Sequence, residues 1–304
     1  MELRSLRAFV EVVRQGGFSR AAKVVSATQS AVSKAVAQLE GELGLQLLER
    51  IGHRSTLTAA GEIVYRRGLA LLAGRDDLLA ELEELRGLTR GILRLGLPPV
   101  GSHTLFAPLF AVYRRRYPGV EIQLVEHGSK RLQEMVLAGE LDLAASPLPV
   151  GEDFEVKDVR CEPVDLLVAA DDPLAKRSGV KLEAVKELPF ILFEVGFALN
   201  TIILDACRQS GFTPTVTARS GQIDFILELV AAKVGVGFLP RMIVEERPHR
   251  GVCNIAIASP LIEWHMVMIW RREGYLSHAS KAWLDLVGER GAGVALQGRE
   301  TVGD

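Results

Sequence analysis

The side chains best suited to chemistry lie in one short stretch near the N-terminus. Five polar residues fall within seven positions there: Thr28, Gln29, Ser30, Ser33 and Lys34. Apolar residues of the same stretch recur at spacings of four, three and four from Val32 to Leu43, which predicts a helix with its polar residues on the outer face. A glutamine amide can pair with the edge of adenine, and hydroxyl or ammonium groups suit phosphate contacts. On its own, such a helix is explained by an ordinary solvated face. Together with the segments that follow it, the stretch predicts a helix that reads DNA chiefly through Gln29.

Basic residues follow this helix. Arg50 ends the segment 45–50, and a turn with Gly52, His53 and Arg54 leads to the segment 55–58. The arrangement predicts a hairpin-like wing with a basic tip, which we expect to clamp the DNA backbone or minor groove beside the helix. Residues 1–60 carry eight Lys and Arg against five Asp and Glu, whereas the whole chain has a net charge of −2. A weakly basic head on a more acidic body is compatible with nucleic-acid contact at this end.

Shorter helices must hold the reading helix in place. Apolar residues recur at helical spacing from Leu3 until Gly16, and a second helix is expected over 18–25, with Ser19 near its start as a capping residue. Two short helices joined by a turn, the second polar on its outer face, predict a helix-turn-helix. Residues 1–60 are therefore expected to form a winged helix-turn-helix domain.

A long helix is expected next, over residues 58–87, with Thr58 as its N-cap and Gly87 at its end. Leucines repeat along it at Leu71, Leu78, Leu82 and Leu85. This spacing is a partial coiled-coil seam, and it predicts a short linker helix through which two copies of the chain dimerise.

From residue 91 onward strands alternate with helices. We expect strands at 92–97, 120–126, 141–145, 164–169, 190–193 and 235–239, and helices at 105–116, 131–137, 199–210 and 223–233. The alternation predicts an α/β fold with parallel sheets. The sheet pattern is left near residue 162 and resumes near 263–270. Residues 91–304 are therefore expected to form subdomain I (about 91–162 and 266–290) and subdomain II (about 163–265), joined by two crossovers.

Several segments together resemble LysR-type transcriptional regulators, and they cover nearly the whole chain. The resemblance is carried in the head by 18–22 (FSRAA), 28–34 (TQSAVSK), 38–40 (QLE), 43–50 and 57–62 (LTAAGE), and further on by 137–144 (LAGELDLA) and 230–240 (VAAKVGVGFLP). The ordered series over the first sixty residues is far more specific than a generic helix-turn-helix. Ser30 stands where proline is commoner in the family and Lys34 where arginine is commoner, which puts the preferred operator in doubt but not the fold.

The resemblance implies both an architecture and a set of partners. The architecture is a winged helix-turn-helix, a long linker helix, and a periplasmic-binding-protein-like effector domain with a ligand cleft between its two α/β subdomains. The partners are a double-stranded DNA operator with an interrupted dyad, a small-molecule effector that is usually a small carboxylate or another organic metabolite, and further copies of the chain in a homodimer that assembles to a homotetramer. RNA polymerase is a further partner that the resemblance allows.

Effector contacts are expected where strands of the α/β domain end and helices begin, because ligands of open α/β sheets lie there and helix N-termini favour anions. The candidates are Ser102, His103, Ser129, Pro147, Phe197 and Thr201. Two alternatives stay open. Ser102 and Ser129 are equally explained as caps of their own helices, and the carboxylates of Glu126 and Glu194 would repel an anionic ligand.

The remaining observations exclude other classes of protein. The motifs of nucleophilic hydrolases, zinc peptidases, dinucleotide-binding enzymes and phosphate loops are absent, and the six histidines are scattered, so neither an enzyme nor a metal or cofactor site is expected. We expect no signal peptide and no membrane span, and hence a cytoplasmic protein. Peroxide-sensing relatives pair two cysteines near Cys207, but the preceding stretch offers no resolving thiol, so we expect Cys207 to be a small buried residue.

Overall fold

The computed structural model describes residues 1–51, 54–85 and 91–297. These residues form two compact units, one built on 1–85 and the other on 91–136 and 141–297. Among the described residues, no helix is both long enough and apolar enough to cross a membrane.

The first unit is a three-helix head with a wing and a long helix. Its elements are α1 (Leu3–Gln15), α2 (Phe18–Val24), α3 (Gln29–Leu43), β1 (Leu48–Ile51), β2 (Arg54–Leu57) and α4 (Ala59–Leu85). Leu6, Phe9 and Leu39 are fully buried where α1, α2 and α3 meet. β1 and β2 pair antiparallel, from Leu48 opposite Leu57 to Ile51 opposite Arg54, which confirms the predicted hairpin.

Two local features join the wing to α4. The N-cap predicted at Thr58 is confirmed, because its Oγ1 accepts a hydrogen bond from the Gly61 amide (2.9 Å). The same hydroxyl donates to the Gln46 carbonyl oxygen (2.8 Å), which ties the start of α4 to the segment before the wing. Gly61 itself leaves no room for a side chain, since a Cβ there would lie 2.1 Å from the Leu47 carbonyl oxygen. The helix is therefore held tightly under the wing.

The leucine seam of α4 lies open to solvent. Leu71, Leu78 and Leu82 are 50%, 56% and 46% exposed. The side chain of Leu85, and Gly87 with the predicted end of the helix, lie outside the described residues. A row of half-exposed leucines at coiled-coil spacing is a surface that association would bury.

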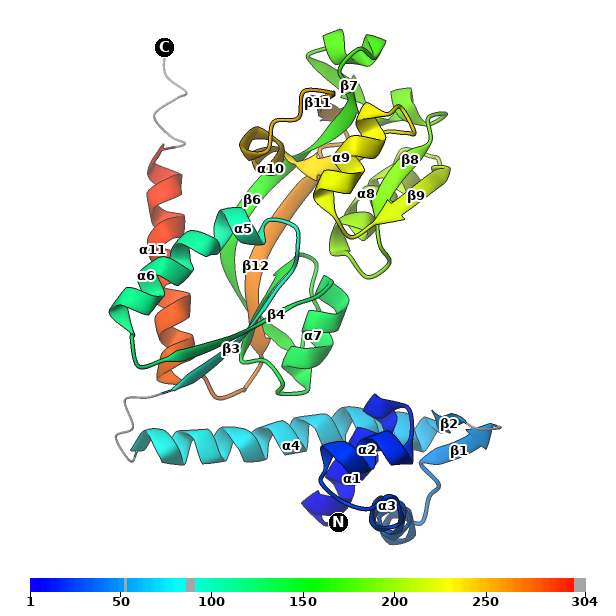
Figure 1. The fold of residues 1–304 in the computed structure, drawn as a ribbon, viewed down its shortest axis with the longest axis vertical. Coiled ribbons are helices and arrows are strands. Elements are labelled where there is room, and N and C mark those ends of the chain that lie inside the picture. Colours follow the sequence, from blue (N-terminus) through cyan, green and yellow to red (C-terminus); the bar gives the residue numbers. More distant parts are fainter. Residues whose placement is uncertain (52–53, 86–90, 298–304) are drawn as a thin grey trace. The chain divides into compact units, whose positions relative to one another are not determined.

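The second unit begins with an α/β subdomain. Its elements are β3 (Ile92–Leu97), α5 (Ser102–Leu105), α6 (Ala107–Arg116), β4 (Glu121–Glu126), α7 (Ser129–Leu137), β5 (Leu143–Pro147), the first half of β6 (Phe154–Ala169), most of β12 (Glu263–Arg271) and α11 (His278–Gln297). α11 packs beside α6 (Figure 1), where Trp283 meets Tyr113 edge to face at 5.4 Å. The single helix predicted over 105–116 is wrong in its start, because the chain forms a separate turn of helix, α5, before it.

The other subdomain of this unit is smaller. It contains the second half of β6, two short 3₁₀ turns (Pro173–Lys176 and Leu182–Val185), β7 (Gly179–Lys181), β8 (Phe190–Phe193), α8 (Ala198–Gln209), β9 (Val216–Ser220), α9 (Ile223–Ala231), β10 (Gly237–Pro240), α10 (Arg241–Glu246) and β11 (Val252–Ser259). Asp165 is buried and accepts hydrogen bonds from the Arg241 guanidinium (3.0 and 2.9 Å) and the Asn254 amide (2.7 Å). Because the carboxylate favours the charged form of the guanidinium, the pKa of Arg241 is raised above its ordinary value.

Two long strands, β6 and β12, pass between the subdomains side by side (Figure 1). β6 pairs antiparallel with β12 over Phe154–Pro163, and with β10 and β11 from Val164 onward. The expectation of parallel sheets is correct for β3 with β4 and β5, but wrong for β12, which runs antiparallel to β5 and β6. The reason is connectivity: β6 leaves the first subdomain and β12 returns to it, so the two strands run in opposite directions.

Candidate nucleic-acid and effector sites

The first turns of α3 present a polar surface. Gln29, Ser30 and Lys34 are exposed and Ser33 is half-buried, while Val32, Val36 and Leu39 on the opposite side are buried in the head. Thr28 precedes the helix as its N-cap, with Oγ1 accepting from the Ala31 amide (3.2 Å) and lying 3.0 Å from the Ser30 hydroxyl. The Thr28 hydroxyl oxygen thus caps α3, and the side chains best placed to meet a groove are chiefly those of the next two turns.

Ser19 has a different place from the one predicted. α2 begins after Gly17 and has no side-chain cap, so Ser19 does not cap it. Its hydroxyl instead donates to Gln29 Oε1 at 3.1 Å, from the first turn of α2 to the first residue of α3. A serine near the start of a helix can either cap that helix or face the neighbouring helix, and the sequence looks the same in both cases. The packing of α2 on α3 decides that Ser19 faces α3.

The wing is described through its backbone. Arg50 pairs with Ser55, and Arg54 pairs with Ile51, at the end of the hairpin. The side chains of Arg50 and Arg54, and the whole of His53, lie outside the described residues. Glu40 was not among the predicted site residues, yet its Oε1 accepts hydrogen bonds from the amides of Leu47 (2.8 Å) and Leu48 (3.2 Å). Glu40 therefore fixes the start of the wing relative to α3.

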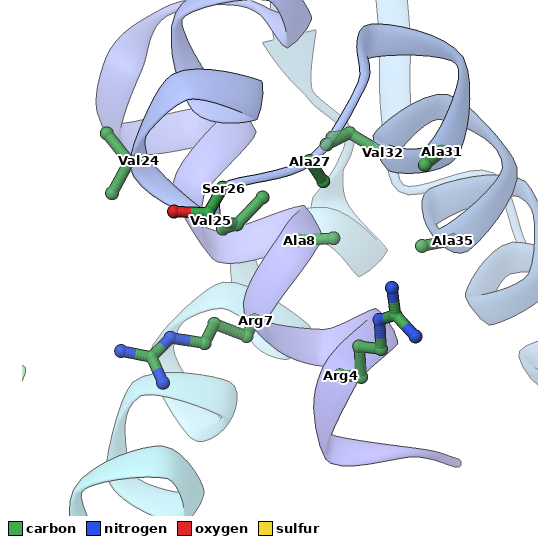
Figure 2. Close-up of a pocket in the computed structure, with 10 residues that line it drawn as sticks. All are labelled: Arg4, Arg7, Ala8, Val24, Val25, Ser26, Ala27, Ala31, Val32 and Ala35. Carbon is green, nitrogen blue, oxygen red and sulfur yellow. The ribbon is translucent and has the colours of Figure 1, made fainter.

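A surface hollow of about 320 Å³ lies beside α1, on the flank of α3. Figure 2 shows it between Arg4, Arg7 and Ala8 of α1, the segment Val24–Ala27, and Ala31, Val32 and Ala35 of α3. Its polar lining residues, Arg4, Arg7 and Ser26, are all exposed, and the rest is valine and alanine. Nothing buried and polar points into the hollow, so it offers a ligand mainly apolar contact and two solvated cations.

In the second unit, the predicted site residues near α5 have protein partners. Ser102 is buried as the first residue of α5, and its Oγ donates to the Pro98 carbonyl oxygen, so it does not cap a helix. His103 is exposed, with Nδ1 3.1 Å from the Thr104 hydroxyl. Thr104 Oγ1 in turn donates to Glu246 Oε2 of α10 at 2.6 Å. This hydrogen bond links the two subdomains.

A second contact between the subdomains lies where α7 begins. The Lys130 amide donates to the Gly196 carbonyl oxygen at 3.4 Å, and a Cβ at Gly128 would lie 3.0 Å from that same oxygen. Ser129, between them, is buried. The structure therefore brings the start of α7, with Ser129, together with the loop that precedes α8, which carries Phe197.

The structure places the other predicted effector residues on β5 and on or just before α8. Phe197 precedes α8 and stacks on Phe193 at 5.2 Å, Thr201 is exposed on α8, and Pro147 is buried at the end of β5. Asn200 was missed as a fixing residue: it accepts from the Phe193 amide and donates to the carbonyl oxygens of Phe193 and Glu194 (3.0, 2.9 and 2.8 Å). This buried amide sets the shape of the wall that carries Phe197.

Thiol and metal chemistry find little support in the described residues. Cys207 is buried, and desolvation raises its pKa to about 11. Cys161 is exposed as a residue, but partial desolvation of its sulfur raises the pKa of its thiol as well, and nearby acidic residues, Glu263 first among them, add to this effect. A raised thiol pKa lowers the fraction of reactive thiolate. No group of three potential metal-ligating side chains occurs in the part of the chain that the structure describes.

Comparison with known families decides what this arrangement is. Residues 3–62 match the family model described as "Bacterial regulatory helix-turn-helix protein, lysR family", and residues 86–292 match "LysR substrate binding domain". The chain belongs to the LysR family of transcriptional regulators. This confirms the predicted resemblance and the α/β fold with an N-terminal helix-turn-helix, and it makes this LysR regulator a DNA-binding protein with an effector-binding domain, not an enzyme.

Individual relatives agree over nearly the full length of the LysR regulator. It is 36% identical over 286 residues to the HTH-type transcriptional regulator YwbI of Bacillus subtilis (strain 168), covering 94% of this chain and 95% of the relative. It is 33% identical over 265 residues to the transcriptional dual regulator GltC of the same strain, covering 86% and 88%. Among solved structures, a full-length OxyR variant from Pseudomonas aeruginosa superposes with a TM-score of 0.66 at 24% identity over 94% of each chain, a likeness of fold.

Proposed function

We propose that this LysR regulator reads an interrupted-dyad DNA operator with the exposed first turns of α3. The observation that carries the proposal is the polar surface of Gln29, Ser30 and Lys34 in front of a buried apolar face. A recognition helix presents its N-terminal residues to base edges, and Gln29 is the side chain there that can pair with a base on two atoms. Thr28, Ser33 and Lys34 serve phosphate or secondary base contacts, and Arg50, His53 and Arg54 of the wing clamp the flanking backbone.

The test begins with duplexes selected by the full-length protein from a randomised pool. We expect Gln29→Ala to weaken binding to the selected duplex by about 1–3 kcal/mol while binding to unselected DNA is retained, because only base reading is lost. Gln38→Ala is the matched control, since Gln38 is exposed on the same helix and, within the part of the chain that the structure describes, its side chain bonds Glu42 alone (3.3 Å). Equal losses on both kinds of DNA for Gln29→Ala would contradict base reading by this residue.

The proposed assembly rests on α4. We propose that two copies dimerise through the leucine seam of the linker helix and that dimers associate into a homotetramer, so that the two-fold axis of the protein matches the dyad of the operator. RNA polymerase is the further partner proposed for a regulator bound at a promoter. Because its proposed ligand is DNA, we propose that the protein works in the cytoplasm.

The proposed effector is a small carboxylate or another organic metabolite bound between the two subdomains. The support is the approach of α7 to the loop before α8, which puts Ser129 beside the wall of Phe197, and the start of a helix favours anions. Ser102, His103, Pro147 and Thr201 complete the candidate set. Glu126 and Glu194 are exposed at the ends of β4 and β8 and oppose an anion, so neutral metabolites belong in the screen.

Effector binding would act by shifting the population of subdomain arrangements, and with it the spacing of the DNA-binding heads in the assembly. A thermal-shift screen of small carboxylates and neutral metabolites identifies the ligand, and DNase footprints with and without it test the coupling. A footprint of unchanged length with a tightly bound effector would refute this mechanism. A chain truncated after residue 90 is expected to keep part of its DNA affinity and to lose the effector response.

A further inference from the structure

The contact between Ser19 and Gln29 joins the two helices of the helix-turn-helix through their side chains. Ser19 Oγ donates to Gln29 Oε1 at 3.1 Å, and both residues are exposed on the surface that holds Ser30 and Lys34. Gln29 Nε2, the other end of the amide, has no protein acceptor within the described residues. The glutamine is thus held by its carbonyl oxygen and leaves its N–H groups available.

We propose that Ser19 is a positioning residue that sets how Gln29 presents its amide to a base, and thereby the preference for a purine at that position. The inference rests on the proposed reading of DNA by Gln29. Ser19 touches no base itself in this scheme; it acts through the side chain that does.

The chemistry follows from counting donors and acceptors. A carbonyl oxygen has two lone pairs, so Oε1 can accept from Ser19 and still accept a second hydrogen bond. With Oε1 held, Nε2 donates outward, and the pair of atoms matches the N6–H donor and N7 acceptor on the major-groove edge of adenine. Without Ser19 the amide turns freely and also presents its oxygen alone, which suits a cytosine N4–H donor.

Preorganisation is the physical benefit. A glutamine side chain has three rotatable bonds, and fixing it on a base gives up much of that freedom. A hydrogen bond already made in the free protein removes part of this loss before DNA arrives. Loss of the hydrogen bond between Ser19 and Gln29 should therefore lower the discrimination between bases by about two- to tenfold, the fold-change that corresponds to one neutral hydrogen bond.

The experiment uses the full-length protein and the duplex that it selects from a randomised pool. Binding is measured by fluorescence anisotropy for wild type, Ser19→Ala, Ser19→Thr, Gln29→Ala and the Ser19→Ala/Gln29→Ala double variant. The base read by Gln29 is first located as the position whose preference is lost in Gln29→Ala. Each protein is then tested on the selected duplex, on duplexes with other bases at that position, and on a duplex with 7-deaza-adenine at that position, a base that lacks the N7 acceptor. Ser26→Ala is the matched control, because Ser26 is an exposed serine in the turn between the same helices.

We expect Ser19→Ala to lower discrimination at that one base by about two- to tenfold, and Ser19→Thr to retain it because threonine keeps the hydroxyl. In the Gln29→Ala background, Ser19→Ala should have no further effect, and 7-deaza-adenine should weaken wild type more than Ser19→Ala. Ser26→Ala should behave as wild type.

Two results would overturn the role of Ser19 while leaving the proposed reading by Gln29 intact. One is an unchanged discrimination between bases in Ser19→Ala. The other is an equal loss of affinity of Ser19→Ala for every duplex, which would indicate a structural role. A Ser19→Ala effect that persists undiminished without Gln29 overturns it too. A wild-type protein that selects no sequence, or Gln29→Ala with its base preference intact, refutes the proposed reading by Gln29 instead.

Discussion

The leucine seam of α4 makes a quantitative prediction about assembly. Leu71, Leu78 and Leu82 are each about half exposed in the single chain. Burying a whole leucine side chain is worth about 1.5–3 kcal/mol, so burying the remaining half gives about 1 kcal/mol per leucine. Two copies of three leucines then contribute about 6 kcal/mol to a dimer.

Leu78→Asp at the centre of the seam removes two of these contributions and buries two carboxylates. We expect the dimer to weaken by at least about 3 kcal/mol, which is roughly two orders of magnitude in its dissociation constant. Sedimentation velocity over a concentration series measures the change, and circular dichroism checks that the helix content is kept.

Leu45→Asp provides the matched control. Leu45 is 58% exposed, as Leu78 is 56%, but it lies in the segment between α3 and the wing and outside the seam. It should leave the dissociation constant unchanged. Leu78→Asp with the wild-type dissociation constant would refute dimerisation through this seam, and equal weakening by both variants would show that the effect is not specific to α4.

Three further predictions concern stability, and a fourth concerns thiol reactivity. Thr58→Ala should lower the free energy of unfolding of the head by about 1–2 kcal/mol, because α4 loses its cap, and Thr58→Ser should restore most of it in urea denaturation. Asp165→Ala should destabilise the second unit by about 3 kcal/mol, since the Arg241 guanidinium loses its buried carboxylate; a calorimetric loss under about 1 kcal/mol would contradict this. The thiol of Cys207 has a pKa raised to about 11, so its contribution to stability is fully present below pH 9 and is lost as the pH rises through 11. The free energy of unfolding should therefore decline less over this pH range in Cys207→Ala than in wild type, and an equal decline in both proteins would contradict the role of the thiol. After treatment with peroxide at neutral pH, mass spectrometry should find Cys207 still in its reduced form, and an oxidised Cys207 would contradict its low reactivity.

The sequence alone determined the elements whose signals are local. The helix that begins at Gln29, the cap at Thr58 and the strands at 92–97 and 190–193 follow from spacings of two to four residues, and each of these elements is confirmed. These patterns are visible because a helix or strand repeats its contacts with near neighbours in the chain. The identity of the family was also within reach, since its motifs are short and ordered.

Tertiary structure decided what depends on partners far apart in the chain. The first half of β6 was not predicted because it is half-exposed and rich in charge, and it becomes a strand by pairing with β12, a hundred residues onward. Ser19 was predicted as a cap and instead holds Gln29, because the packing of α2 on α3 sets which polar atoms meet. The approach of Gly128 to Gly196 likewise depends on β6 and β12, the paired strands that run from one subdomain to the other. Spacing within a segment encodes its periodicity, but the choice of hydrogen-bond partner across segments is made only when the chain folds.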